Sequence, residues 1–182
     1  FCEPDEILAW TIEHRSSDSG RTISNVGGYQ SNDIVKKVMQ DEAQPIIKLF
    51  DSVISAAQLI RDEWNVYKGR RLTIVSSWIN VNRSIFDSNS FHVHPGCWLA
   101  ATYYPERSVD GGQLVIKDPR PQHVMSLDEV NEPFSRYTNI NMSFEPDRGQ
   151  LFMFPSWLEH SVSNNHKQTA NRTVIAMNVG VV

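Results

Sequence analysis

The sequence is poor in cysteine and has no hydrophobic run long enough to cross a membrane. Its 182 residues include two cysteines, Cys2 and Cys97, which are too few for the disulfide framework of a small secreted domain. A membrane-spanning helix needs about 20 consecutive apolar residues, and the sequence contains neither such a run nor the hydrophobic segment of a signal peptide. We therefore expect a cytoplasmic location and no membrane partner. Because the chain begins with Phe1 rather than Met, we expect it to be a piece of a longer protein.

The sequence also lacks an excess of basic residues. It has 17 Lys and Arg against 21 Asp and Glu, for a formal net charge of −4, and no basic stripe of the kind that binds nucleic acid. Hydrophobic residues make up 40% of the chain and charged residues 21%, which is typical of a globular protein. A chain of this length forms one ordinary domain with a substantial core. We expect a single domain over residues 1–182 and no nucleic-acid partner.

The first third of the chain has the apolar periodicity of helices. Between Gln44 and Tyr67 the apolar residues fall on one stripe, which predicts a long amphipathic helix with Pro45 in its first turn. The stripe consists of Ile46, Phe50, Val53, Ile54, Ala57, Ile60 and Trp64. A shorter helix is expected over residues 33–40, and the turn-rich residues 24–31 are expected to form an irregular lead-in. Residues 1–68 are thus predicted to be a helical support.

After Gly69 the sequence changes to short runs typical of β-strands, separated by Pro, Gly, Asn and Asp. The runs are LTIVSSWINVN (72–82), FHVH (91–94), WLAATYYP (98–105), GQLVIKDP (112–119), GQLFMFP (149–155) and RTVIAMNVGVV (172–182). Helices followed by many short strands predict an α+β fold that is mainly β, with the strands of residues 69–182 forming a sandwich or barrel.

Two histidines stand two residues apart in FHVHPGCW, residues 91–98. Alternate residues of a strand point to the same face with Cα atoms about 6.5–7 Å apart, so His92 and His94 can aim their imidazoles at one point. Two protonated rings there would repel each other, whereas a shared metal ion binds both rings in the neutral form. His160, in FMFPSWLEHSV, is the other histidine near the end of a predicted strand. The remaining histidines, in polar surroundings, are His14, His123 and His166.

The pair by itself is a weak sign, because a histidine is more often structural or exposed than a ligand. The order of the surrounding motifs is more specific. The H-x-H pair is followed by LAATYY, DGGQLVIKDPR, RGQLFMFPSWLEHSV and NRTVIAMN. This order resembles the iron(II)- and 2-oxoglutarate-dependent dioxygenases, specifically the 2OG-Fe(II) oxygenase family related to prolyl hydroxylases. The run SNVGGYQS (24–31) is also similar to the N-terminal segment of that family, so the resemblance covers nearly the whole chain.

The resemblance implies a double-stranded β-helix, of the jelly-roll or cupin-like type, supported by the N-terminal helices. It also implies an Fe(II) site in which His92, His94 and His160 match the three ligand positions, with open positions for 2-oxoglutarate and O₂. Arg172 matches the arginine that receives the far carboxylate of 2-oxoglutarate. A planar guanidinium suits that role because it can bind a carboxylate through two hydrogen bonds. Without the resemblance, a strand arginine is more often one partner of a surface ion pair.

Two further cofactor contacts are expected from the resemblance. Tyr104 matches the tyrosine whose hydroxyl reaches the same carboxylate, although a tyrosine in a strand is as often part of the aromatic core. Tyr103 points the opposite way and is expected to pack in the core. Asn82 lies on the strand before the histidine pair and shares a face with Trp78 and Asn80. Asn178 shares a face with Arg172, six residues away.

The sequence departs from the family at His94, where relatives usually carry Asp or Glu. Three readings follow: all three histidines bind the metal, or His94 leaves its position to water or an ion, or a carboxylate from elsewhere takes its place. Asp87 and Glu159 are the candidates for that carboxylate, and strand alternation turns Glu159 away from its neighbour His160. We favour three histidine ligands.

The predicted function is that of a non-haem Fe(II)- and 2-oxoglutarate-dependent oxygenase that hydroxylates a substrate with release of succinate and CO₂. Its cofactors would be Fe(II) and 2-oxoglutarate, with ascorbate as an optional reductant. One alternative is a cupin-type dioxygenase with three histidines that does not use 2-oxoglutarate, and a second is a non-catalytic jelly-roll binding module. The substrate, a small molecule or a peptide, is not readable from the sequence, and neither is the oligomeric state.

Overall fold

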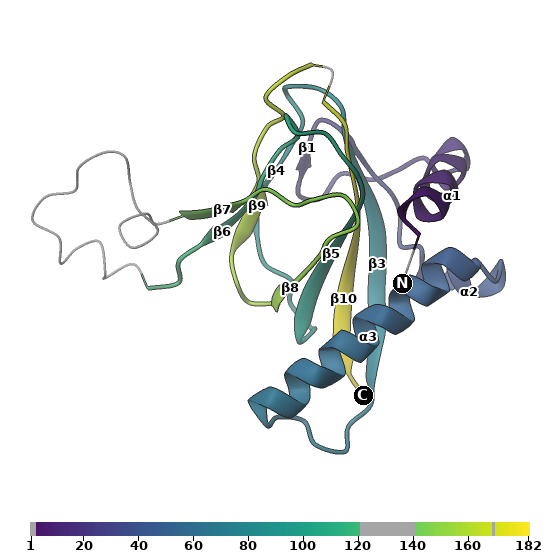
Figure 1. Ribbon diagram of the computed structural model, residues 1–182, viewed down its shortest axis with the longest axis vertical. Coiled ribbons are helices and arrows are strands. Elements are labelled where there is room, and N and C mark those ends of the chain that lie inside the picture. The colour runs from purple at the N-terminus through teal and green to yellow at the C-terminus, as the bar shows by residue number, and fades with distance from the viewer. Residues whose placement is uncertain (1–2, 121–140, 169) are drawn as a thin grey trace, which may run out of the picture.

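A computed structural model describes residues 3–120, 141–168 and 170–182, and Figure 1 shows its elements in chain order. The helices are α1 (Pro4–Ser17), α2 (Val35–Gln40) and α3 (Gln44–Trp64). The strands are β1 (Asn25–Val26), β2 (Tyr29–Gln30), β3 (Leu72–Asn82), β4 (Ser88–His92), β5 (Leu99–Arg107), β6 (Leu114–Lys117), β7 (Asn141–Phe144), β8 (Leu151–Pro155), β9 (His160–Val162) and β10 (Arg172–Val181). The predicted long and short helices are confirmed as α3 and α2.

The described strands form two antiparallel sheets. The major sheet has the order β2-β3-β10-β5-β8, and the minor sheet has the order β1-β4-β9-β6-β7. Apart from the pairs β2-β3 and β6-β7, neighbouring strands in the sheets are not neighbours in the sequence, so distant parts of the chain are brought together. With three helices beside these sheets, the expectation of a mainly β fold with helices at the N-terminus is confirmed.

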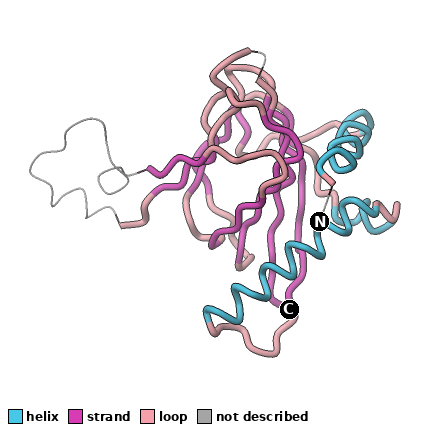
Figure 2. Tube along the Cα trace, viewed as in Figure 1, coloured by secondary structure: helices cyan, strands magenta, loops and turns pink. Residues whose placement is uncertain are grey.

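The helices cover one face of the major sheet (Figures 1 and 2). The stripe of α3, apart from Trp64, which is 49% exposed, packs there with the outward-facing side chains of β3 and β10 in one apolar core. These side chains include Ile79, Ile175 and Met177. Tyr103 belongs to this core, as predicted from its direction on β5. The opposite face of the major sheet looks toward the minor sheet, since residues of both sheets line one cavity between them. The helices thus pack on one face of the major sheet, and the face toward the minor sheet is available for a site.

Two features of the chain differ from the expected pattern of strands. The segment expected to be an irregular lead-in contains the two-residue strands β1 and β2, which pair with β4 and β3. Strand β7, which pairs with β6, was not predicted. Two-residue strands have no measurable periodicity, and their pairing depends on partners far away in the sequence.

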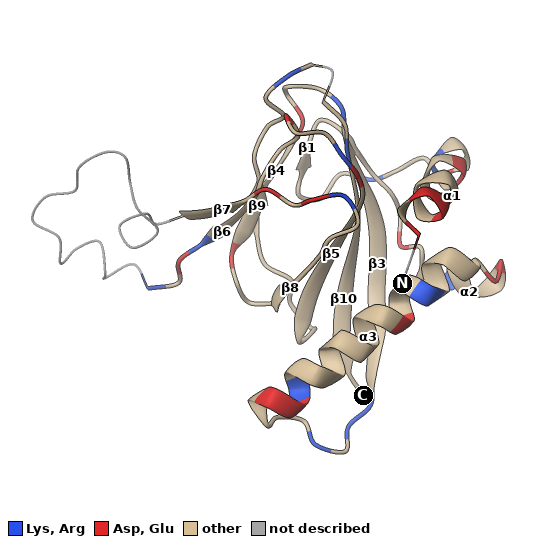
Figure 3. Ribbon diagram, viewed as in Figure 1, with Lys and Arg blue, Asp and Glu red and all other residues tan. Residues whose placement is uncertain are grey.

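Charged residues of both signs are interspersed along the described helices and loops, as the colours of Figure 3 show. Among the described residues, no helix is long and apolar enough to span a membrane.

Candidate metal and cofactor site

Three histidines meet at the ends of two neighbouring strands of the minor sheet. His92 ends β4, His160 begins β9, and the two residues are paired across the antiparallel ladder. His94 lies two residues beyond the end of β4, and its ring stacks on that of His92 with the ring centres 5.1 Å apart. The fold therefore brings together the pair and the distal histidine that the sequence singled out. Among the described residues, they are the one cluster of three or more His, Cys, Asp or Glu side chains able to hold a metal ion.

Each of the three rings is oriented by a hydrogen bond at Nδ1. His92 Nδ1 donates to the carbonyl oxygen of Ser90 at 2.7 Å, and His160 Nδ1 donates to that of Leu158 at 2.9 Å. A carbonyl oxygen can only accept, so in both rings the proton sits on Nδ1 and the lone pair on Nε2 is free. A metal-binding imidazole is commonly held in this way by an acceptor at its other nitrogen.

His94 has an acceptor of a different kind. Its Nδ1 lies 2.6 Å from Oδ1 of Asn178, and Nδ2 of Asn178 donates to Oγ of Ser76 at 2.9 Å. Asn178 and Ser76 are paired on β10 and β3, so the major sheet fixes the amide that orients His94. The ring of Trp78 also stacks on His94, with the ring centres 5.5 Å apart.

The free nitrogens converge. Nε2 of His94 and Nε2 of His160 are 3.2 Å apart, and the candidate ligand atoms of all three rings lie within 4.8 Å of one another. Two imidazole nitrogens bound at right angles to one metal ion, at about 2.1 Å each, are about 3 Å apart. Two bare lone pairs at this distance repel each other, and a cation between them removes the repulsion. The donor set therefore fits a divalent transition metal.

The protonation state of the site also suits a metal. Burial lowers the pKa of His92 and of His94, and it lowers that of His160 to about 4, with the neighbouring rings adding to the effect at His160. At neutral pH all three rings are therefore uncharged and their lone pairs are available, as metal binding requires.

The two carboxylates considered as substitutes for His94 are engaged elsewhere. Asp87 is buried and accepts backbone N–H groups of Gly28, Arg83 and Ser84. Glu159 accepts a hydrogen bond from Lys117 Nζ at 2.7 Å. Neither belongs to the described cluster of metal-ligating side chains.

Arg172 lies at the other end of the cavity between the sheets. The cavity is narrow, about 30 Å³, and its lining includes the three histidines and Arg172. This volume holds about two water molecules, so a larger ligand requires the lining side chains to move apart. Val174, Leu114 and Val162 form apolar walls between the two ends.

Arg172 is 2% exposed, and among the described residues no carboxylate lies within ion-pair distance of its guanidinium. Burial lowers the pKa of Arg172, because a charged guanidinium is less stable away from water. Its Nη2 donates a long hydrogen bond, 3.4 Å, to the hydroxyl of Tyr104, and Nε has no partner. A buried cation without a counter-ion is costly unless a ligand supplies the anion. The site therefore fits a carboxylate at Arg172.

The other predicted contacts lie around this cavity. Tyr104 is fully buried and its ring lies beneath the Arg172 guanidinium, 5.2 Å away. Asn82 is the register partner of Arg172 across β3 and β10. Of the two asparagines that share a face of β3, Asn80 lines the cavity and Asn82 does not. A contact between Asn82 and a cofactor remains a prediction. Thr102, which the sequence analysis did not single out, also lines the cavity and donates to the Tyr104 hydroxyl at 3.3 Å.

Comparisons with known proteins agree with this geometry. Residues 76–178, more than half of the chain, match the family described as "Putative 2OG-Fe(II) oxygenase". The chain belongs to this family. The family predicted from the sequence is thereby confirmed, and with it the enzyme class, that of the 2-oxoglutarate-dependent oxygenases. No curated protein matches the sequence.

Solved structures share the fold at low sequence identity. A prolyl-4-hydroxylase from Pseudomonas putida is 14% identical with a TM-score of 0.62, over 97% of this chain and 87% of that one. A prolyl hydroxylase from Trichoplax adhaerens, in complex with a hypoxia inducible factor peptide fragment, is 13% identical with a TM-score of 0.62, over 96% and 77%. The 2OG-dependent carbocyclase SnoK of nogalamycin biosynthesis is 11% identical with a TM-score of 0.60, over 98% and 75%. Of two other matched structures the chain spans less than half, 47% and 44%.

Proposed function

We propose that the protein is an Fe(II)- and 2-oxoglutarate-dependent oxygenase whose iron is held by three histidines. The observation that carries the proposal is that one cavity contains two features that are each electrostatically unfavourable without a ligand. Three bare imidazole nitrogens converge at one end, and an unpaired buried arginine stands at the other. One metal ion and one dicarboxylate would relieve both. We further propose that the two sheets form a double-stranded β-helix within a single domain over residues 1–182.

His92, His94 and His160 would hold the iron through Nε2. A set of three neutral ligands leaves the full charge of the ion in place, whereas the usual carboxylate cancels one unit. An anionic ligand is therefore attracted more strongly to this ion than to one that already has a carboxylate ligand. The oxo-acid end of 2-oxoglutarate is such a ligand, so the His94 substitution is compatible with cofactor binding.

Arg172 would receive the far carboxylate of 2-oxoglutarate, with Tyr104 contributing its hydroxyl and Asn82 a further polar contact. The chemistry that iron and 2-oxoglutarate supply when bound is the reduction of O₂. One oxygen atom enters succinate with loss of CO₂, and the other is transferred to a C–H bond of the substrate. The apolar walls of the cavity exclude water from this step, while the hydrogen bonds at the three Nδ1 atoms keep the rings in place. Ascorbate is proposed as an accessory reductant.

The substrate is proposed to be a peptidyl group or a small molecule. Structures with this fold include both a prolyl hydroxylase bound to a peptide fragment and a carbocyclase of a biosynthetic route. The surface next to His92 gives room for either, since a cavity of about 480 Å³ lined by Val93, Trp157 and Glu159 opens beside it.

The proposal is tested by anaerobic titration of the protein with Fe(II) and then with 2-oxoglutarate. A metal-to-ligand charge-transfer band that saturates at one equivalent of 2-oxoglutarate is expected. The Arg172→Met variant should bind iron as the wild type does but require at least about tenfold more 2-oxoglutarate for the same band, because one charge-assisted contact is lost. Arg83→Met, at a half-exposed arginine paired with Glu106, is the matched control.

The other outcomes separate the alternatives. Iron binding without any band on addition of 2-oxoglutarate would indicate a three-histidine dioxygenase that does not use this cofactor. Absence of iron binding would indicate a non-catalytic binding module. An unchanged band in Arg172→Met would contradict the role given to Arg172.

A further inference from the structure

A second cavity adjoins the proposed metal site and shares His92 and Val93 with the 480 Å³ opening. It measures about 250 Å³, and His92 and His94 form part of its wall. The segment between α1 and α2 contributes Arg21, Ile23, Gln30 and Asp33 to its lining, β3 contributes Trp78, and Val93 lies between the two histidines. A ligand in this cavity would therefore lie next to two of the proposed iron ligands. The family match begins at residue 76, so the whole segment between α1 and α2 lies outside it.

The cavity contains a cation without a counter-ion. Nε of Arg21 is buried without a hydrogen-bond partner, and among the described residues no carboxylate pairs with the Arg21 guanidinium. The guanidinium lies over the ring of Trp78, 5.9 Å from its centre, and the same ring stacks on His94. Gln30, which is 2% exposed, also lines the cavity with its Oε1 unpaired.

The carboxylate in the cavity forms no ion pair with Arg21. Asp33 lies on the lining, but its two oxygens accept the backbone N–H groups of Val35, at 2.9 Å, and Ser77, at 3.3 Å. Exposed apolar side chains flank the opening, with Ile23 67% and Val93 45% exposed. An apolar cavity with a few convergent polar groups is the usual form of a small-ligand site.

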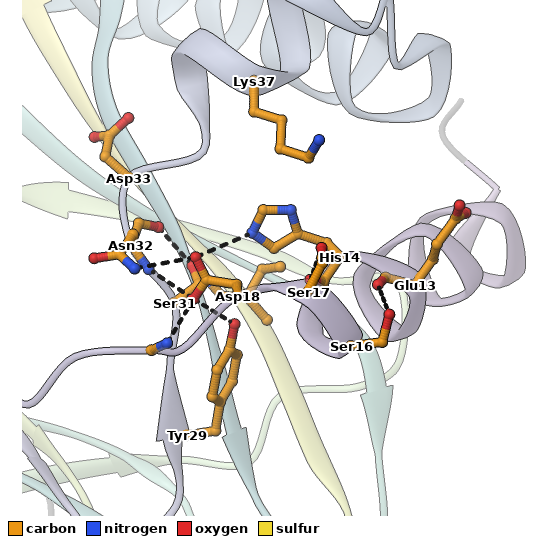
Figure 4. Close-up of polar contacts among 12 residues, drawn as sticks. Glu13, His14, Ser16, Ser17, Asp18, Tyr29, Ser31, Asn32, Asp33 and Lys37 are labelled. Carbon is orange, nitrogen blue, oxygen red and sulfur yellow. Dashed lines mark hydrogen bonds and ion pairs between the residues drawn. The ribbon is translucent and has the colours of Figure 1, made fainter.

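The segment that carries Arg21 and Gln30 is fixed in place. The backbone N–H of Arg21 donates to the carbonyl oxygen of Gln30 at 2.8 Å, which sets the two side chains beside each other. Figure 4 shows the anchor of the segment: Asp18 accepts hydrogen bonds from the Tyr29 hydroxyl and from Asn32, and also from the backbone N–H of Gly20. Burial works to raise the pKa of Asp18, but these hydrogen bonds outweigh it and keep the pKa below the usual value. A fixed cation loses little conformational entropy on binding an anion.

We propose that the Arg21 cavity binds an oxyanion of the substrate, a carboxylate or a phosphate, and so selects an anionic substrate for the reaction at the iron. This proposal depends on the proposed function, because the cavity is a substrate site only if the three histidines hold the iron. Guanidinium is the side chain best suited to this task, since its planar donors match both oxyanions. Ile23, Trp78 and Val93 would contact the apolar part of the same molecule.

Side-chain NMR of arginine Nε–H groups tests the proposal directly. Zn(II)-loaded protein, a diamagnetic stand-in for the iron form, is titrated with acetate and separately with inorganic phosphate, with and without saturating 2-oxoglutarate. The Arg21 resonance, assigned by its absence in Arg21→Gln, is expected to shift saturably with at least one anion in both series. Acetate and phosphate distinguish a carboxylate from a phosphate ligand. Arg15→Gln is the matched control, because Arg15 also lies over an aromatic ring, that of Tyr29 at 5.1 Å, but does not line the cavity.

The result also separates this proposal from the proposed function. If 2-oxoglutarate fails to bind but the Arg21 resonance still responds to the anions, the cavity is an anion site and the proposed function is wrong. If neither anion shifts the Arg21 resonance saturably while 2-oxoglutarate binds, the anion site is wrong and the proposed function stands. A loss of 2-oxoglutarate affinity in Arg21→Gln would assign Arg21 to the cofactor and overturn the substrate role.

Discussion

At the scale of single residues, the site depends on how each imidazole is held. His92 and His160 are oriented by carbonyl oxygens within two residues of themselves, so their local backbone sets the ring. His94 depends on Asn178, which comes from the other sheet. In the proposed metal site, Asn178 would therefore be a positioning residue that links the major sheet to His94.

We expect Asn178→Ala to weaken Fe(II) binding by about 10- to 100-fold, the usual effect of losing such an oriented acceptor. Asn178→Asp keeps an oxygen at the same position and should bind the metal at least as well as the wild type. Metal affinity measured by competition with a chromophoric chelator checks both variants. Equal affinities in Ala and Asp variants would mean that Asn178 has only a structural role.

Arg172 leads to a prediction about stability. The Arg172→Met substitution removes a buried charge that has no counter-ion and keeps a side chain of similar length. The free energy of unfolding of the metal-free protein should therefore stay the same or rise, by about 1–3 kcal/mol. The variant should at the same time lose affinity for 2-oxoglutarate. Urea unfolding followed by circular dichroism measures the first effect. A loss of several kcal/mol would show that Arg172 stabilises the sheet itself and is not held there for a ligand.

Much of the site could be predicted at this scale, and the reasons are physical. The spacing of His92 and His94 and the direction of Tyr104 follow from strand alternation, which is readable in the sequence. Asn178 was placed on the face of Arg172, but its bond to His94 needs the approach of two sheets. Arg21 gave no signal, because its position is set by the fold of a turn-rich segment around Asp18 and not by any periodicity.

At the scale of elements, long strands and helices were predicted more closely than short ones. Strand β3 has the predicted bounds, and α3 begins at the predicted Gln44 and ends at Trp64, three residues before the predicted end. The chain turns at Asn65, which has a positive φ of 56°. Strands β1 and β2 were missed because their pairing partners, not their own residues, make them strands.

Helix α3 offers a matched pair of leucines to test its role as a support. Leu49 is 2% exposed in the core behind the major sheet, whereas Leu59 is 73% exposed on the same helix. Leu49→Ala should lower the free energy of unfolding by about 2–5 kcal/mol through lost burial and a cavity. Leu59→Ala should change it by about 0.5 kcal/mol or less. Chemical unfolding of the metal-free variants provides the comparison, and similar losses at both positions would contradict the packing described.

At the scale of the whole molecule, two sheets whose strands are interleaved along the chain meet at one cavity. The cluster of neutral histidines in that cavity makes the fold sensitive to acid. Because burial lowers the pKa of His160 to about 4, below its ordinary 6.5, the unfolded chain binds a proton more readily than the folded one. The stability contributed by neutral His160 is complete above pH 6.5 and is lost as the pH falls toward 4.

We expect the metal-free protein to lose about 3 kcal/mol of stability over this range from His160. The lowered pKa values of His92, His94 and His14 act in the same direction. Urea unfolding at a series of pH values, with His160→Gln as the comparison, measures the slope. A variant with the same slope as the wild type would show that His160 is not the group that titrates.

The central claim is that His94 binds the iron where relatives usually carry a carboxylate. X-ray absorption at the iron edge of the anaerobic Fe(II) and 2-oxoglutarate complex tests it most directly, because scattering from imidazole rings reports their number. The account predicts three imidazoles in the wild type and two in His94→Ala. Two imidazoles in both proteins would contradict it.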